Sequence, residues 1–219
     1  MYARARHNSD SGFTLVEVSI VLVVIALLIG SVLVAVNILQ NARITSAITT
    51  LQSIQSAVST YNQNYGAVPG DDAQAVARFG VTNNGGGNGI IGAATLSGTF
   101  NDTSAALTNG NGNAESRLVW SHLRAAGLIR GQGGDVTQPG NPFGGVFGIQ
   151  NGAFSADGIG LGTNVVCVSN VPGAAAVIID QREDDGIATT GNMRAGTVIT
   201  GAASAYVDTS TYVLCTRAL

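Results

Sequence analysis

Hydrophobic residues are concentrated in one run near the N-terminus, and charge does not interrupt them. Residues 1–12 form a short polar segment, and the apolar run that follows extends from Val18 to Val36. Only Ser19, Gly30 and Ser31 break its series of aliphatic side chains. A helix of this length is long enough to cross the roughly 30 Å hydrocarbon core of a bilayer. The pattern therefore predicts one membrane-spanning helix over this run.

A second pattern continues the helix beyond the apolar run. Apolar residues recur every three or four positions from Ile44 to Tyr65, with Gln, Ser, Thr and Asn between them. This spacing is typical of an amphipathic helix, and Gly66 and Pro69 are suited to end it. We therefore expect one helix over residues 13–65. Its first half, apolar on all sides, is expected to protrude, and its second half to pack on a globular head.

The chain has 30 glycines and only 11% charged residues, so we expect a loop-rich head over residues 66–219. Two helices are predicted there: a short one over residues 73–79, capped by Asp71 or Asp72, and an amphipathic one over residues 115–128. A long helix packed on a small antiparallel sheet is an α+β architecture. Strands are predicted over residues 146–149, 165–168 and 212–216, a helix or a strand over 172–180, and a long loop over 83–112.

One carboxylate lies at the start of the apolar run. Glu17 is the last charged residue before Arg43. An ionisable group inside a membrane segment is costly and normally has a functional partner. Two interpretations are open: Glu17 has such a partner, or it lies at the membrane boundary of an uncleaved single-span anchor.

The six residues before the run are Gly12-Phe13-Thr14-Leu15-Val16-Glu17. This segment resembles the signal of type IV prepilins and of the pseudopilins of type II secretion, in which a glycine and usually a phenylalanine precede a glutamate and an apolar helix. In an ordinary secretory signal the cleavage site follows the apolar region, whereas Gly12 precedes it. The resemblance implies cleavage between Gly12 and Phe13, so that residues 1–12 are a leader and the helix stays on the mature chain.

The resemblance also implies a mode of assembly. Pilin-like proteins pair the glutamate of this signal with the N-terminal amine of a neighbouring subunit, which assigns this role to Glu17 and the amine to Phe13. Residues 13–36 are then the membrane span and filament core. Because the usual proline partway along this helix is absent, Gly30 is the candidate flexible point. The implied partners are a prepilin peptidase/N-methyltransferase, other pilin or pseudopilin subunits, and an inner-membrane assembly platform.

Charge agrees with an exported, membrane-anchored protein. Arg4 and Arg6 precede the span and Asp10 is the only acid there, so the positive-inside tendency keeps the leader in the cytoplasm and the head outside. The net charge is −3, which offers no basic face for nucleic acid. We expect a single-pass protein of the inner (cytoplasmic) membrane that later enters a pilus or pseudopilus.

Cys167 and Cys215 are the only cysteines of the chain. A pair on the oxidising side of the membrane suggests one disulfide, and two buried free thiols are the alternative. Many type IV pilins carry a comparable C-terminal disulfide, so the resemblance extends to this pair. Metal binding by these cysteines is poorly supported, because neither has another Cys or a His nearby.

Two motifs that suggest chemistry have simpler explanations. The glycines of Gly87-Asn88-Gly89-Ile90-Ile91-Gly92 have the spacing of a dinucleotide-binding fingerprint, but no strand precedes them, so we predict a loop. His122 lies on the apolar side of a predicted helix and is expected to be a hydrogen-bonded core histidine, since no nucleophile partner is identifiable. The sequence therefore predicts neither an enzyme nor a cofactor.

The acidic segment over residues 180–186 is the one candidate metal site. Clustered carboxylates that end in glycine supply the oxygen ligands that calcium prefers, and some pseudopilins bind calcium in a C-terminal loop. However, Gln181 breaks the alternate spacing of an EF-hand, and Arg182 adds a countercharge. A solvated turn is the favoured interpretation. Calcium is the alternative, with these ligands: Asp180, Glu183, Asp184 and Asp185.

Two functional classes follow from the first helix. In the first, the chain is a structural subunit of a type IV pilus or a type II secretion pseudopilus. In the second, it is a minor or tip pilin whose head is a binding module for adhesion, DNA uptake or recognition of an exported protein.

Overall fold

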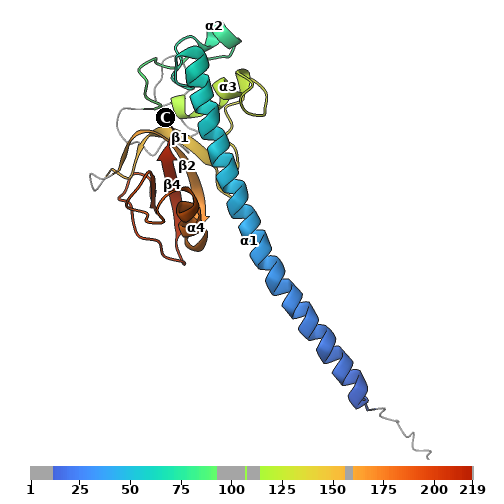
Figure 1. Cartoon of the computed structure of the whole chain (residues 1–219). Helices are drawn as coiled ribbons and strands as arrows, with labels where there is room; N and C mark the ends of the chain where they lie inside the picture. The colour runs from blue at the N-terminus through green and yellow to red at the C-terminus, as the bar shows by residue number, and fades with distance from the viewer. Residues whose placement is uncertain (1–11, 93–106, 108–113, 156–159, 219) are drawn as a thin grey trace, which may run out of the picture. The chain divides into compact units, whose positions relative to one another are not determined.

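The computed structural model describes residues 12–92, 107, 114–155 and 160–218. The chain divides into two compact units, residues 1–42 and residues 43–219. Helix α1 (Leu15–Tyr65) contributes to both units (Figure 1). This helix was predicted over residues 13–65, and its existence and extent are confirmed.

In the first unit α1 has no buried side chain. The described residues from Gly12 to Ala42 are all exposed. The hydroxyls of Ser19 and Ser31 donate hydrogen bonds to backbone carbonyls one turn earlier, at 2.8 Å, so the helix itself satisfies these polar groups, as hydrocarbon surroundings require. By length and composition, α1 is long and apolar enough to cross a membrane.

The second unit contains a four-stranded antiparallel sheet with the strand order β1-β2-β4-β3. Together with α1, this sheet gives the predicted α+β fold. Three of the strands were expected from the sequence, and the structure extends each of them. The fourth, β3, was not expected. The strands are β1 (Phe147–Ala153), β2 (Leu161–Pro172), β3 (Met193–Gly196) and β4 (Thr211–Arg217).

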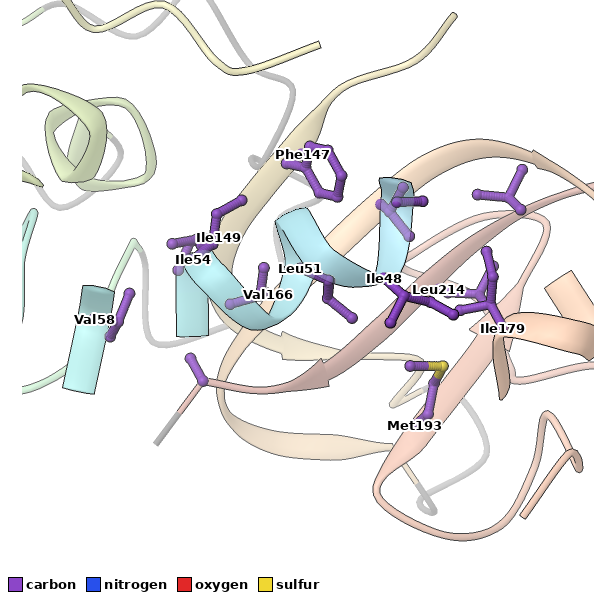
Figure 2. Close-up of a cluster of buried hydrophobic side chains, with 14 of the residues drawn as sticks. Ile48, Leu51, Ile54, Val58, Phe147, Ile149, Val166, Ile179, Met193 and Leu214 are labelled. Carbon is purple, nitrogen blue, oxygen red and sulfur yellow. The ribbon is translucent and has the colours of Figure 1, made fainter. Parts of the chain in front are cut away.

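The second half of α1 packs one face against the sheet. Figure 2 shows side chains of α1 gathered in one cluster with Ile149 of β1, Val166 of β2 and Leu214 of β4. The buried residues of α1 recur at the three- and four-residue spacing of a helical face. They are Ile44, Ala47, Ile48, Leu51, Ile54, Ala57, Val58 and Tyr61.

The continuous apolar stretch of β2 is explained by burial on both faces of the sheet. Val166 and Val168 belong to the cluster that contains α1, whereas Val165 and Cys167 belong to a second cluster with Phe154. Successive side chains of a strand point to opposite faces. The sheet is therefore covered by helices on one face and by loop residues on the other.

Among its described residues the head also contains three shorter helices: α2 (Ala75–Phe79), α3 (Glu115–Ala125) and α4 (Gly173–Glu183). The segment that fitted a helix or a strand is thus the helix α4, which lies beside the sheet (Figure 1). The cap expected for the short helix is wrong, because Gln74 holds the capping position and its side chain makes no capping hydrogen bond. Of the predicted loop 83–112, residues 93–106 and 108–112 lie outside the described residues.

Candidate functional site

The N-terminus of α1 is closed by a reciprocal pair of hydrogen bonds between Thr14 and Glu17. The Glu17 carboxylate accepts from the Thr14 backbone N–H at 2.9 Å and from the Thr14 hydroxyl at 2.8 Å. The Glu17 N–H donates in turn to the Thr14 hydroxyl oxygen at 3.2 Å. This is a capping box, which satisfies N–H groups that a helix leaves without partners at its first turn.

The capping box gives Glu17 a local partner that sequence reasoning missed. The signal was present, because Thr14-x-x-Glu17 before an apolar run is the pattern of this motif. Phe13 lies directly before it and is 86% exposed. The peptide bond between Gly12 and Phe13 therefore lies immediately outside the first turn of α1, where the backbone is not helical.

In the second unit, the two cysteines form a disulfide between neighbouring strands. Cys167 of β2 and Cys215 of β4 are opposite one another in the register of the sheet, and their sulfur atoms are 2.08 Å apart. Both residues are fully buried. The predicted disulfide is confirmed, and the alternative of two free thiols is wrong.

The glycine-rich segment that resembled a dinucleotide fingerprint binds carboxylates of its own chain. Asp71 accepts hydrogen bonds from the backbone N–H groups of Gly87, Asn88 and Gly89. Glu115 accepts from Gly86 at 2.8 Å and from Gly92 at 2.9 Å. Consecutive N–H groups of this kind form a concave anion site. Internal carboxylates occupy this site, and the N–H groups of Ile90 and Ile91 donate to the side chains of Asn88 and Asn164. The loop therefore has no N–H group left for a phosphate.

His122 has the structural role that the sequence predicted. Its Nδ1 accepts from the Gly70 N–H at 2.9 Å, and its Nε2 lies 3.1 Å from the Asn83 carbonyl oxygen. The ring is therefore neutral with its proton on Nε2, because a protonated Nδ1 cannot accept. Burial lowers the pKa of His122, which agrees with this state. Both nitrogens are engaged by backbone groups, and neither is available to a substrate.

The acidic segment after α4 is held by hydrogen bonds within its own loop. Asp184 accepts from the Met193 N–H at 2.8 Å, and Asp185 accepts from the Ile187 N–H at 2.9 Å. The Thr190 hydroxyl also donates to Asp185 and lowers the pKa of that carboxyl. These contacts are those of a folded turn.

Three carboxylates of this segment nevertheless offer oxygen atoms within 4.8 Å of one another: Asp180, Asp184 and Asp185. Asp180 is fully buried; one oxygen accepts from the Tyr206 hydroxyl at 2.7 Å, and the other has no hydrogen-bond partner among the described residues. Burial raises the pKa of the Asp180 carboxyl. Glu183, the fourth candidate ligand, instead accepts hydrogen bonds from Gln52 of α1. The cluster is weakly compatible with calcium.

Comparison with protein families gives one match, at the N-terminus. The family model of the prokaryotic N-terminal methylation motif matches residues 7–33. The chain carries a type IV pilin-like prepilin signal. The match includes Gly12, Phe13 and Glu17 together with most of the apolar run, so the resemblance noted from the sequence is confirmed.

This prepilin signal points to a structural protein that is processed by a prepilin peptidase and assembles with other pilins in a membrane-associated system. The apolar helix that follows the signal fits an inner-membrane anchor. Comparisons with curated proteins and with solved structures found no match for the chain.

Proposed function

We propose that the chain is a structural subunit of a type IV pilus or a type II secretion pseudopilus. One observation carries the proposal: the methylation motif at residues 7–33 opens a helix whose described side chains are all exposed as far as Ala42. Exposed aliphatic side chains on every side of a helix need lipid or sister helices as surroundings. A subunit that moves from membrane to filament supplies both.

Processing creates the charge that Glu17 is proposed to bind. Hydrolysis of the peptide bond between Gly12 and Phe13 consumes one water and leaves a carboxylate on Gly12 and an ammonium group on Phe13. In the unprocessed chain the Glu17 carboxylate already accepts two hydrogen bonds from Thr14. A carboxylate has two oxygens with about four acceptor positions in all. Glu17 therefore keeps acceptor capacity for the Phe13 ammonium of a neighbouring subunit.

The pairing between subunits is favoured by the apolar surroundings. An unpaired charge in hydrocarbon is costly, and removing one partner of a buried pair leaves the other uncompensated. A newly arriving subunit lowers this cost only in the axial position where its ammonium meets the carboxylate of its neighbour. The pair thus sets the stagger between subunits at the filament base.

The test separates the charge of Glu17 from its capping role. Glu17→Gln keeps the capping box, because Gln is accepted at this position of the motif, but it removes the charge. We expect wild-type amounts of Glu17→Gln in the membrane and incorporation into filaments reduced by about tenfold or more. Thr14→Ala is the matched control, since it removes the capping hydroxyl and leaves the carboxylate. Incorporation of Glu17→Gln at the wild-type level would contradict the pairing.

A minor or tip subunit with a binding head is the second functional class. Abundance distinguishes the two classes, because a major subunit dominates filaments sheared from cells and a tip protein is barely detectable in them. Quantifying this chain against the other subunits of sheared filaments decides between them. The wild type and Glu17→Gln are compared at equal expression levels, so that the result is valid for a major subunit and for a minor or tip subunit.

The oxygen of Asp180 that lacks a hydrogen bond favours a calcium site as an addition to this function. We propose Asp180, Asp184 and Asp185 as its ligands, because their carboxylate oxygens lie within 4.8 Å of one another. Calorimetric titration of the full chain with calcium is expected to show saturable binding that Asp184→Asn abolishes and Asp208→Asn, an exposed control, leaves intact. If the wild type shows no saturable binding of calcium, the acidic segment over residues 180–186 is a solvated turn.

A further inference from the structure

The side chain of His122 joins helix α3 to two separate segments of the head. His122 is 0% exposed. Its Nδ1 accepts a hydrogen bond from the Gly70 backbone N–H at 2.9 Å, and its Nε2 lies 3.1 Å from the carbonyl oxygen of Asn83. Gly70 lies in the turn between α1 and α2, and Asn83 follows α2. One imidazole ring therefore holds two connecting segments against α3.

Both contacts require the neutral ring with its proton on Nε2. A backbone N–H can only donate, so Nδ1 must be unprotonated, and the carbonyl of Asn83 can only accept, so Nε2 must carry the proton. The charged ring carries a proton on each nitrogen. In that state the Nδ1–H would point at the Gly70 N–H, and the two donors would repel each other. The contact with Gly70 therefore exists only while His122 is neutral.

Close packing around Gly70 leaves the turn little freedom to adapt. A Cβ on Gly70 would lie 2.6 Å from the Glu115 carbonyl oxygen and 3.1 Å from the Val119 backbone nitrogen, so the turn is fitted closely against α3. On another side of the imidazole, the Tyr61 ring is stacked at 6.5 Å between ring centroids. Protonation of the ring is therefore relieved by separation of the turn from α3.

Burial and charge have opposite effects on the ring. Burial has the larger effect and lowers the pKa of His122, whereas the charges of Asp72 and Asp71 favour the protonated form. Other ionisable groups around the ring come from three helices: Tyr61 of α1, Arg78 of α2, which is ion-paired with Asp72, and Glu115 of α3. The geometry of the two hydrogen bonds and the effect of burial both favour a neutral ring.

We propose that His122 is an acid-opened clamp: at neutral pH its ring holds the turn at Gly70 against α3, and protonation of the ring in acid releases the turn. The turn borders a polar cleft of about 520 Å³, whose lining includes Tyr65, Asp72 and Asn88. Release of the turn changes the shape of this cleft. The clamp responds to the pH outside the cytoplasm if the head is exported, so its role in the cell rests on the proposed function.

The direction of the pH dependence follows from the lowered pKa of His122. A base whose pKa is lowered in the closed head stabilises that state fully above its ordinary pKa of about 6.5. This contribution is lost as the pH falls from about 6.5 towards the lowered pKa. Carboxyl groups also gain protons in acid, so a test must cancel their contribution.

The experiment compares the wild type with His122→Asn, both as full chains in detergent micelles. The side-chain oxygen of asparagine replaces Nδ1 as an acceptor and does not titrate, so the variant keeps a partner for Gly70 at every pH. Amide hydrogen exchange of Gly70, corrected for the intrinsic effect of pH, is measured between pH 7.5 and pH 4.5. Strand β2 is the internal reference, and the carboxyl groups contribute equally to both proteins.

The clamp predicts that the protection of Gly70 in the wild type, divided by that in His122→Asn, falls by about threefold or more as the pH is lowered across this range. A smaller change in this ratio overturns the proposal. Neither protein has to assemble into a filament for this measurement, so a failure of the clamp is distinguishable from a failure of the proposed function.

If His122→Asn does not fold, the nitrogen-15 shifts of the His122 ring decide. They are measured in a chain that carries His7→Ala, because His7 is the other histidine. A proton on Nε2 at pH 7.5, together with a titration midpoint below about pH 6.5, supports the clamp. A proton on Nδ1, or a midpoint at or above this value, overturns it.

Discussion

The side chain of Asp72 connects α1 with α2 in the head. Its buried carboxylate accepts from the Tyr61 hydroxyl of α1 at 2.7 Å and from the Arg78 guanidinium of α2 at 2.6 Å. It also accepts from the Gln74 backbone N–H at 2.8 Å. The sequence suggested a helix cap for this residue. It did not show the contacts with Tyr61 and Arg78, because those depend on how α1 and α2 pack.

Replacing Asp72 by alanine is expected to destabilise the head by about 2–4 kcal/mol, because it removes the acceptor of the buried Tyr61 hydroxyl and the ion-pair partner of Arg78. Urea unfolding of the full chain, followed by the fluorescence of Trp120, measures this change. Trp120 is the only tryptophan and is fully buried. Asp208→Ala, at an exposed position, is the control and is expected to change stability by less than about 0.5 kcal/mol. Equal effects of the two substitutions would refute the role of Asp72.

At the scale of elements, α1 has two halves with different surroundings. In the second half Leu51 is 2% exposed within the head, whereas Leu33 in the first half is 63% exposed. Leu51→Ala is expected to lower the free energy of unfolding by about 2–5 kcal/mol, since it leaves a cavity in a packed core. Leu33→Ala removes the same atoms and is expected to leave the unfolding of the head unchanged. A similar loss for both variants, again by Trp120 fluorescence, would contradict this division of the helix.

The disulfide joins two elements that are already adjacent in the sheet. Cys167 and Cys215 are separated by 48 positions, and a closed loop of this length stabilises by about 4 kcal/mol in the chain-entropy model. The double variant with alanine at both positions is expected to keep the sheet but to unfold at lower urea concentration. Circular dichroism and urea titration test both expectations. An unchanged urea midpoint would show that the disulfide adds no stability to the pairing of β2 with β4.

The sequence predicted those elements whose residues carry a strong local pattern. The helix over residues 13–65 is long and periodic, and β2 contains a run of apolar β-branched residues, so local physics determines both. Strand β3 was missed because Met-Arg-Ala-Gly is only four residues long and has no β-branched residue, and its pairing with β4 forms it. Residues 172–180 stayed ambiguous because packing of Ala176 and Ile179 in the main cluster selects the helix.

The candidate sites also differ in whether a local sequence pattern predicted them. Gly12, Phe13 and Glu17 are contiguous, and their motif was recognisable without a fold. The pair of Asp71 and Glu115 was not recognisable, because 43 intervening residues separate them and neither stands in a local motif. Contacts that are remote in sequence depend on tertiary structure, and no periodic pattern predicts them.

At the scale of the whole molecule, the N-terminal segment and the head have different relations to known proteins. The methylation motif ends at residue 33, before the first buried residue of α1, Ile44. Export, processing and polymerisation are proposed for the segment that the motif covers. Under the proposed function, recognition of other molecules falls to the head, which the motif does not cover.

Intact-mass and N-terminal peptide spectrometry of filaments sheared from cells shows whether this chain is processed as a pilin. We expect a mature chain that begins at Phe13, carries a methyl group on its N-terminal nitrogen and retains the apolar helix. The same spectrum reports how abundant the chain is in the filament. A mature chain that begins at Met1, or that begins after Val36, would contradict the account.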